Sequence, residues 1–192
     1  MNKLSVYTLL LALTVVFACK KEKKETAQEV EETTTEEVVN VAPKKIIINL
    51  ESKSDSNVAG TVVFTKNNGE VKMVALLSNL EEGEHAIHLH DKADCSSTDG
   101  KSAGGHWNPT GQPHGKWGDA TGFHKGDIGN FKADANGNGT ITFVTDQWCI
   151  GCDDDTKNII GKGVIVHQGT DDYTSQPSGA AGSRVSCGGI IE

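Results

Sequence analysis

The sequence predicts an all-β domain, an eight-stranded antiparallel Greek-key barrel or sandwich with two long functional loops. Short apolar or alternating runs recur between turn signals, and no helical period of useful length is present. The chain also has 22 glycines, which imply many turns and close backbone approaches. Its 192 residues are 36% hydrophobic, which suits one ordinary domain with appendages and excludes a large multidomain enzyme.

Four strands are expected before a long glycine-rich connection, and four after it. They cover residues 45–50, 58–65, 71–77, 84–90, 127–133, 140–145, 163–167 and 184–191. Asn-Asn-Gly at 67–69 and Asn-Gly-Asn-Gly at 136–139 are typical of hairpin turns. The connections at 91–125 and 168–183 are longer than linking strands requires, so we expect them to carry function.

The N-terminal segment predicts a signal peptide. Residues 1–18 carry one basic residue, Lys3, and an apolar stretch from Tyr7 to Phe17 that is too short to span a bilayer as a helix. A small residue, Ala18, directly precedes a lone cysteine, and this arrangement resembles the lipobox of bacterial lipoproteins. We expect Cys19 to be acylated. The alternative is a simple secretory signal, and either one exports the protein.

Residues 19–45 predict a lipid-anchored, flexible and charged tether. Lysine, glutamate and threonine dominate it, so it cannot bury enough apolar surface to offset its chain entropy. A short helix is the alternative, but no apolar stripe would dock it. The folded domain is expected at 46–192. The protein would be a membrane-anchored lipoprotein of the bacterial cell envelope, facing the periplasm or exposed at the surface.

The charge balance argues against nucleic acid as a partner. The chain has 18 Lys and Arg against 26 Asp and Glu, a formal net charge of -8. The broad electrostatic attraction that drives nucleic-acid binding is therefore missing.

Histidines point to a metal site. The folded region contains seven, at positions 85, 88, 90, 106, 114, 124 and 167. His88 and His90 are two residues apart on one expected strand, so both imidazoles project from one face and can reach a common ion. His167 ends a β-branched run, where a strand end could aim it at this pair. His85 faces the other way, and we expect it to be a hydrogen-bonded histidine within the sheet.

A second set lies along the glycine-rich connection. His106, His114, His124 and Asp127 offer three nitrogens and one carboxylate, a donor set that suits tetrahedral zinc. Imidazole-rich sites suit copper and zinc, and a carboxylate in only one of the two sets indicates two different ions.

Five segments together resemble the copper/zinc superoxide dismutase family. They read GEHAIHLH at 83–90, GGHWNP at 104–109, HKGDIGN at 124–130, VH at 166–167 and AGSRVSCG at 181–188. The resemblance spans 46–192. It implies an oxidoreductase that converts superoxide to oxygen and hydrogen peroxide by cycling between Cu(II) and Cu(I). Ala86 stands where the family commonly has glycine and Gln168 where an acid is frequent, but neither change removes a ligand.

The resemblance implies one copper ion and one zinc ion per subunit. Copper would be held by His88, His90, His106 and His167. Zinc would be held by His106, His114, His124 and Asp127, with His106 bridging the two ions as an imidazolate. Asp171 matches the carboxylate that links a copper ligand to a zinc ligand, and Arg184 matches the arginine that orients the anionic substrate beside copper. The oligomeric state stays open, with a homodimer among the alternatives.

Four cysteines remain once Cys19 is assigned to lipid, an even number for an oxidising compartment. By the resemblance, Cys95 and Cys187 form the family's intrasubunit disulfide. Cys149 and Cys152 lie outside the family pattern, and their spacing permits a local disulfide, a redox dithiol or a soft-metal site. We expect a structural disulfide that braces the loop before residue 163.

Two other classes of protein compete with the dismutase. A non-catalytic copper/zinc-binding or copper-delivery module of the cell envelope could use the same sandwich without turnover. It would gain little from a complete bridged zinc set together with Asp171 and Arg184. An adhesive sandwich domain anchored by Cys19 would need none of the histidines. The sequence therefore favours the dismutase.

Overall fold

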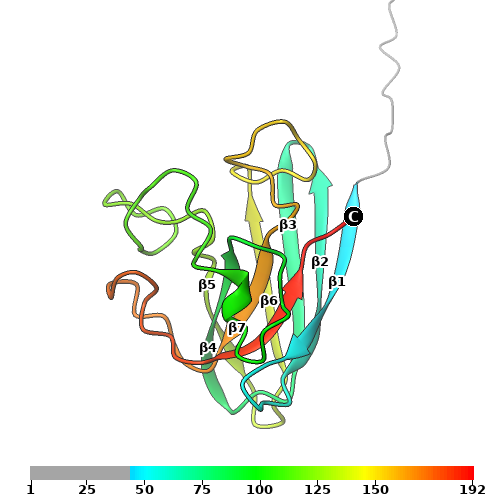
Figure 1. Ribbon diagram of the computed structural model, residues 1–192, viewed down its shortest axis with the longest axis vertical. Coiled ribbons are helices and arrows are strands. Elements are labelled where there is room, and N and C mark those ends of the chain that lie inside the picture. The colour runs from blue at the N-terminus through cyan, green and yellow to red at the C-terminus, as the bar shows by residue number, and fades with distance from the viewer. Residues whose placement is uncertain (1–43) are drawn as a thin grey trace, which may run out of the picture. The chain divides into compact units, whose positions relative to one another are not determined.

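Eight antiparallel strands close into a barrel in the computed structural model, which describes residues 44–192 (Figure 1). They are β1 Lys45–Ser52, β2 Ala59–Asn67, β3 Glu70–Ser78, β4 Gly83–His90, β5 Gly129–Ala133, β6 Gly139–Thr145, β7 Gly163–His167 and β8 Arg184–Gly189. The all-β prediction is confirmed. The expected signal peptide and Cys19, with nearly all of the expected tether, lie outside the described residues.

The strand order around the barrel is β1-β2-β3-β6-β5-β4-β7-β8, and β8 pairs with β1 to close it. Because β6 rather than β4 lies beside β3, strands β3 to β6 form a Greek key. β4 therefore pairs with β5 on one side and β7 on the other, with Ile87 opposite Val166. This antiparallel pairing places β7, which ends at His167, directly beside the strand that carries His88 and His90.

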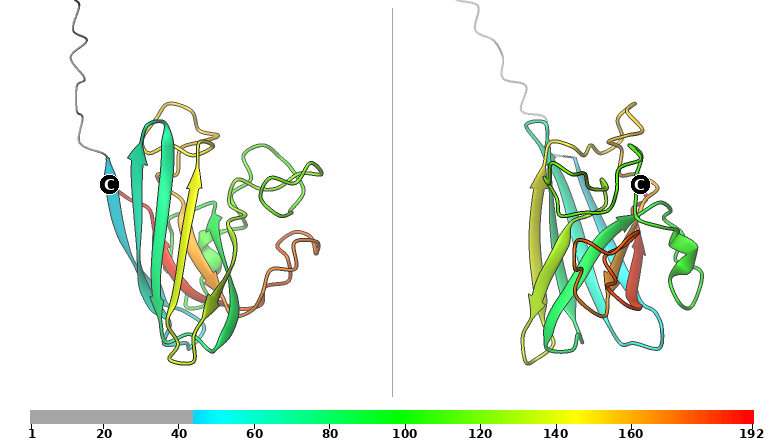
Figure 2. Two further views of the ribbon diagram at one scale, coloured as in Figure 1. Left: turned by 180° about the vertical axis from the view of Figure 1, so that it is seen from behind. Right: turned by 90° about the vertical axis from the view of Figure 1, so that its left-hand side faces the viewer.

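The pattern of buried and exposed residues shows which strands are covered by loops on their outer face. β1 alternates between exposed and buried residues, and its inward side chains Ile46, Ile48 and Leu50 belong to the barrel core. All five residues of β7 are buried, so this strand is covered on its outer face as well. The connections from β4 to β5 and from β7 to β8 project from the same side of the barrel (Figures 1 and 2). The site forms under these two connections.

Four predicted boundaries were wrong by two residues. The first two strands extend to Ser52 and Asn67, two residues past their expected ends. The fifth strand begins at Gly129 rather than at Asp127, because the Asp127 N–H turns back to donate to the His124 carbonyl at 3.1 Å. The last strand ends at Gly189 rather than at Ile191. Apart from the strands, the structure gives residues 44–192 one short 3₁₀ turn, Lys101–Ala103, and none of their helices could cross a membrane.

Candidate metal centre

Three elements bring four imidazoles together. β4 carries His88 and His90, β7 ends at His167, and His106 in the β4–β5 connection pairs with His90 as an isolated bridge. The ring centroids of His88 and His106 lie 4.0 Å apart, and those of His88 and His167 lie 5.0 Å apart. All four side chains are buried, and one ring nitrogen of each lies within 4.8 Å of the others. We call these four residues the imidazole group.

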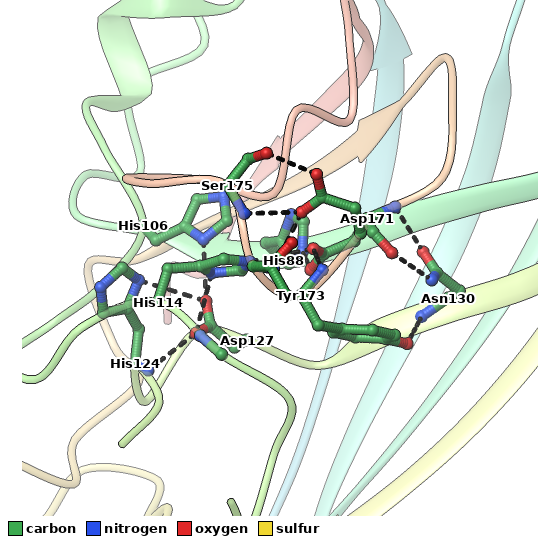
Figure 3. Close-up of polar contacts among 12 residues, drawn as sticks. His88, His106, His114, His124, Asp127, Asn130, Asp171, Tyr173 and Ser175 are labelled. Carbon is green, nitrogen blue, oxygen red and sulfur yellow. Dashed lines mark hydrogen bonds and ion pairs between the residues drawn. The ribbon is translucent and has the colours of Figure 1, made fainter. Parts of the chain in front are cut away.

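A second buried group shares His106 and adds three residues from the same connection. His106, His114, His124 and Asp127 also bring one donor atom each within 4.8 Å of one another. The Asp127 carboxylate lies at the centre of this group, 2.8 Å from Nδ1 of His106, 3.0 Å from Nδ1 of His114 and 3.2 Å from Nδ1 of His124 (Figure 3). We call these four residues the carboxylate group.

The histidine nitrogens fit metal ions in both groups. Six buried ring nitrogens have no hydrogen-bond partner among the described residues: Nδ1 of His88, His114 and His124, and Nε2 of His90, His106 and His167. A buried polar atom without a partner is costly, so such atoms require an explanation. Metal ligation supplies one, because each histidine of the two groups contributes a nitrogen that faces its own group. Four imidazoles suit copper, and three imidazoles with a carboxylate suit zinc.

The opposite nitrogens of four of these rings are held by the protein. His88 Nε2 and His114 Nε2 each lie 2.9 Å from a different carboxylate oxygen of Asp171. His90 Nδ1 lies 2.9 Å from the Gly104 carbonyl, and His167 Nδ1 lies 3.4 Å from the Gly182 carbonyl. Such contacts fix the tautomer and the orientation of a ligating ring. Asp171 joins a ring of the imidazole group to a ring of the carboxylate group.

Burial and charge set the protonation of the site. Desolvation lowers the pKa of His90 and His167 well below the usual value, and it lowers the pKa of His106 to about 4. These rings are therefore neutral at pH 7, the form that binds metal. Burial also disfavours charge on His114, but the nearby carboxylates of Asp127 and Asp171 outweigh it and raise the His114 pKa to about 9.

Arg184 begins β8 opposite His167, next to the imidazole group. Its Nη1 donates to the Gly100 carbonyl at 2.8 Å, and its positive charge contributes to the low pKa of both His90 and His167. The guanidinium is partly exposed, so it can meet an anion that approaches the imidazole group.

Both expected disulfides are present in the structure. Cys95 and Cys187, with Cα atoms 5.8 Å apart, join the β4–β5 connection to β8 three residues after Arg184. Cys149 and Cys152 close a short loop between β6 and β7, so they are neither a free dithiol nor a thiolate metal site here. Disulfides are typical of exported proteins.

His85 lies outside both groups. Its ring nitrogens contact the His167 carbonyl at 3.0 Å and the Glu81 carbonyl at 2.9 Å, in agreement with the expectation of a hydrogen-bonded histidine in the sheet.

Two supporting residues were not predicted. The Asn130 amide pairs with the backbone of Asp171 in both directions at 2.8 Å, and it lies in the HKGDIGN segment that could have suggested it. Gly179 has a φ of +68°, and a Cβ there would lie 1.7 Å from Oδ1 of Asp171. Among so many glycines, nothing in the sequence distinguishes this one.

Together these features define a β-barrel protein with two adjoining buried residue groups that fit metal ions and share one histidine. The family model for copper/zinc superoxide dismutase matches residues 58–190. The chain therefore belongs to the copper/zinc superoxide dismutase family, whose members are oxidoreductases.

Named relatives and solved structures agree with this assignment. A Cu-Zn superoxide dismutase of Talaromyces marneffei is 37% identical over 150 residues, which cover 72% of this chain and 92% of the relative. An extracellular Cu-Zn superoxide dismutase of Caenorhabditis elegans is 35% identical over 144 residues, but the match spans only 63% of that protein. Two crystal structures are also similar. The clock protein EA4 is 33% identical with a TM-score of 0.67, and the match covers 79% of this chain and 97% of EA4. A double mutant of a superoxide dismutase-like protein from Bacillus subtilis is 27% identical with a TM-score of 0.68, and the match covers 76% of this chain and 97% of the mutant.

Proposed function

We propose that this protein converts superoxide to oxygen and hydrogen peroxide at a copper ion in the imidazole group, with zinc in the adjoining carboxylate group. The observation that carries the proposal is the pair of buried four-residue groups that share His106 and direct unpartnered nitrogens inward. When bound, copper supplies one-electron chemistry, oxidising one superoxide ion and reducing the next.

The two nitrogens of His106 serve different groups. Nδ1 lies against Asp127, whereas Nε2 is unpartnered and belongs to the imidazole group. Nε2 is therefore the position at which His106 can hold a proton and deliver it to reduced oxygen. The His106 pKa of about 4, which results mainly from burial, shows that this ring does not hold a second proton at pH 7 in the metal-free protein.

Arg184 is the residue that we assign to substrate binding. Superoxide is an anion, and a fixed guanidinium provides charge and hydrogen-bond donors where the anion must sit. The Gly100 carbonyl holds this side chain in place. The disulfide from Cys95 to Cys187 in turn ties the surrounding loop to β8.

The proposed location is the bacterial cell envelope. Residues 1–18 would be removed, Cys19 would carry lipid, and residues 19–45 would tether the domain to a membrane, facing the periplasm or the surface. The two disulfides and the match to an extracellular relative support export. Mass spectrometry of the mature chain should find an acylated N-terminal Cys19. An unacylated N-terminus at another residue would contradict the anchor.

The assembly we propose is a homodimer, which the family resemblance allows. Light scattering of the metal-loaded protein should then give twice the mass of one chain. The mass of a single chain would contradict the dimer and leave the metal assignment unchanged.

A variant of His167 separates the two metals. His167 belongs only to the imidazole group, so His167→Ala should abolish superoxide decay and copper retention while zinc stays close to one ion per chain. Gln168→Ala is the matched control, because this neighbouring side chain is exposed and outside both groups. Normal turnover in the His167 variant would contradict the copper assignment. Copper and zinc bound in the unmodified protein without superoxide decay would instead favour a non-catalytic copper-handling module.

A further inference from the structure

The connection from β6 to β7 contacts the turn that carries His124 and Asp127. Trp148 is 1% exposed, and its indole Nε1–H donates to the Lys125 carbonyl at 2.8 Å. Lys125 directly follows His124 and stands two residues before Asp127. The indole therefore holds the backbone between two members of the carboxylate group.

The backbone of this turn, residues 124–127, is fixed at each of its first three carbonyls. The His124 carbonyl accepts from the Asp127 N–H at 3.1 Å, and the Gly126 carbonyl accepts from the Leu89 N–H at 2.9 Å. Between them, the Lys125 carbonyl accepts from the indole of Trp148. The carbonyls of His124 and Gly126 are thus held by backbone N–H groups, whereas the Lys125 carbonyl between them is held by a side chain.

A second contact links Trp148 to the same connection. Its ring centroid lies 5.9 Å from that of Trp117, which stands in the chain between His114 and His124 and packs on Phe123 at 4.8 Å. On the barrel side, Trp148 packs against Phe143 of β6 at 5.0 Å. Trp148 therefore lies between the barrel wall and the loop that carries the carboxylate group.

The disulfide loop gives Trp148 a fixed base. Cys149, the next residue, donates its N–H to the Lys157 carbonyl at 2.8 Å and accepts from the Ile159 N–H at 3.1 Å. Its side chain is bonded to Cys152, which closes the loop within three residues. These contacts restrict the backbone on which the indole stands.

We propose that Trp148 is a positioning residue for the zinc site, held in place by the loop that Cys149 and Cys152 close. It orders the 124–127 turn so that Nδ1 of His124 and the carboxylate of Asp127 face His106 and His114 before metal binds. The inference rests on the proposed assignment of zinc to the carboxylate group. It extends that assignment to a segment that touches neither metal group directly.

Trp148→Phe is the direct test, made in the full-length protein. The variant keeps an aromatic ring but removes the N–H that the Lys125 carbonyl accepts. Loss of one net hydrogen bond of about 1 kcal/mol corresponds to about a fivefold weaker zinc affinity. Competition with a chromophoric zinc chelator measures the dissociation constant. The visible absorption of Co²⁺ bound in place of zinc reports ligand geometry, so it should shift in the variant, while copper affinity should stay within about twofold.

Phe143→Leu is the matched control. Phe143 packs against the same indole, and its replacement leaves the hydrogen bond from Trp148 to the Lys125 carbonyl intact. This variant should therefore lose thermal stability while it keeps its zinc affinity and cobalt spectrum. A second variant, Cys149→Ser with Cys152→Ser, keeps the indole but removes the disulfide that restrains the backbone next to it. It should weaken zinc binding by less than Trp148→Phe does, and it provides the test if the tryptophan variant does not fold.

The outcomes separate this inference from the proposed function. Unchanged zinc affinity and an unchanged cobalt spectrum in Trp148→Phe would overturn the positioning role, provided that the unmodified protein binds zinc. Equal losses of zinc affinity in Trp148→Phe and Phe143→Leu would also overturn it, since they would indicate general destabilisation. Failure of the unmodified protein to bind zinc in the carboxylate group would instead overturn the proposed function.

Discussion

Replacing Asp171 by asparagine should weaken zinc binding strongly while leaving the chain folded. The buried carboxylate accepts from His88 Nε2 and His114 Nε2, each at 2.9 Å. An amide has only one oxygen, so one of the two rings must face an NH₂ group instead of an acceptor. The backbone of residue 171 would keep its place, because the side-chain amide of Asn130 bonds to its N–H and carbonyl groups, which the substitution does not change.

Zinc affinity should fall more than copper affinity. His88 stands on β4, and the paired strand holds its ring in place even without Asp171. His114 lies in a long connection, where its Asp171 contact fixes the ring on the side away from the metal. Hydrogen bonds to charged groups are worth about 1.5–3 kcal/mol, which corresponds to about a 10- to 150-fold loss of zinc affinity.

Chelator competition in the full-length protein measures this loss for zinc and copper separately. Asp172→Asn is the matched control, because this exposed neighbour bonds to Ser175 and Thr174 rather than to a histidine. Zinc affinity within threefold of the unmodified protein would refute the reasoning, and so would a larger loss of copper than of zinc.

Four further predictions follow from the same contacts. Zinc binding to the metal-free protein at pH 7.5 should release about one proton, because the His114 pKa of about 9 keeps this ring protonated until metal displaces the proton; calorimetry in two buffers of different ionisation enthalpy measures the release, and none would contradict it. Arg184→Ala should lower kcat/KM by about tenfold or more with both metals retained, since the guanidinium is not a ligand; unchanged kcat/KM would contradict its role. Removing the disulfide by Cys95→Ser with Cys187→Ser should lower the free energy of unfolding by about 4–5 kcal/mol, the value that the chain-entropy model gives for a sequence separation of 92. Denaturant titration measures this free energy, and a loss below about 1 kcal/mol would refute the prediction. Gly179→Ala should lose zinc as Asp171→Asn does, because the added Cβ would overlap the Asp171 carboxylate; normal zinc content by elemental analysis would argue against it.

The features that the sequence predicted well are local ones. Alternation of apolar and polar residues identifies β1, because neighbouring side chains on a strand point to opposite faces. The spacing of His88 and His90 places both rings on one face of β4 for the same reason. Family resemblance added the link from Asp171 to both groups, which no local pattern contains.

Long-range contacts explain what the sequence did not predict. The bond from Trp148 to Lys125 spans 23 residues, and neither position belongs to a motif that indicates the other. The strand boundary at Gly129 depends on how Asp127 turns toward His124, which is a property of the folded loop rather than of strand propensity. Gly179 matters only because Asp171 lies against it.

Superoxide decay, measured with copper and zinc counted in the same sample of full-length protein, tests the central claim most directly. The account predicts one ion of each metal per chain and a decay rate proportional to the copper content. Full occupancy of both metals without catalysed decay, or decay that does not depend on copper, would contradict it.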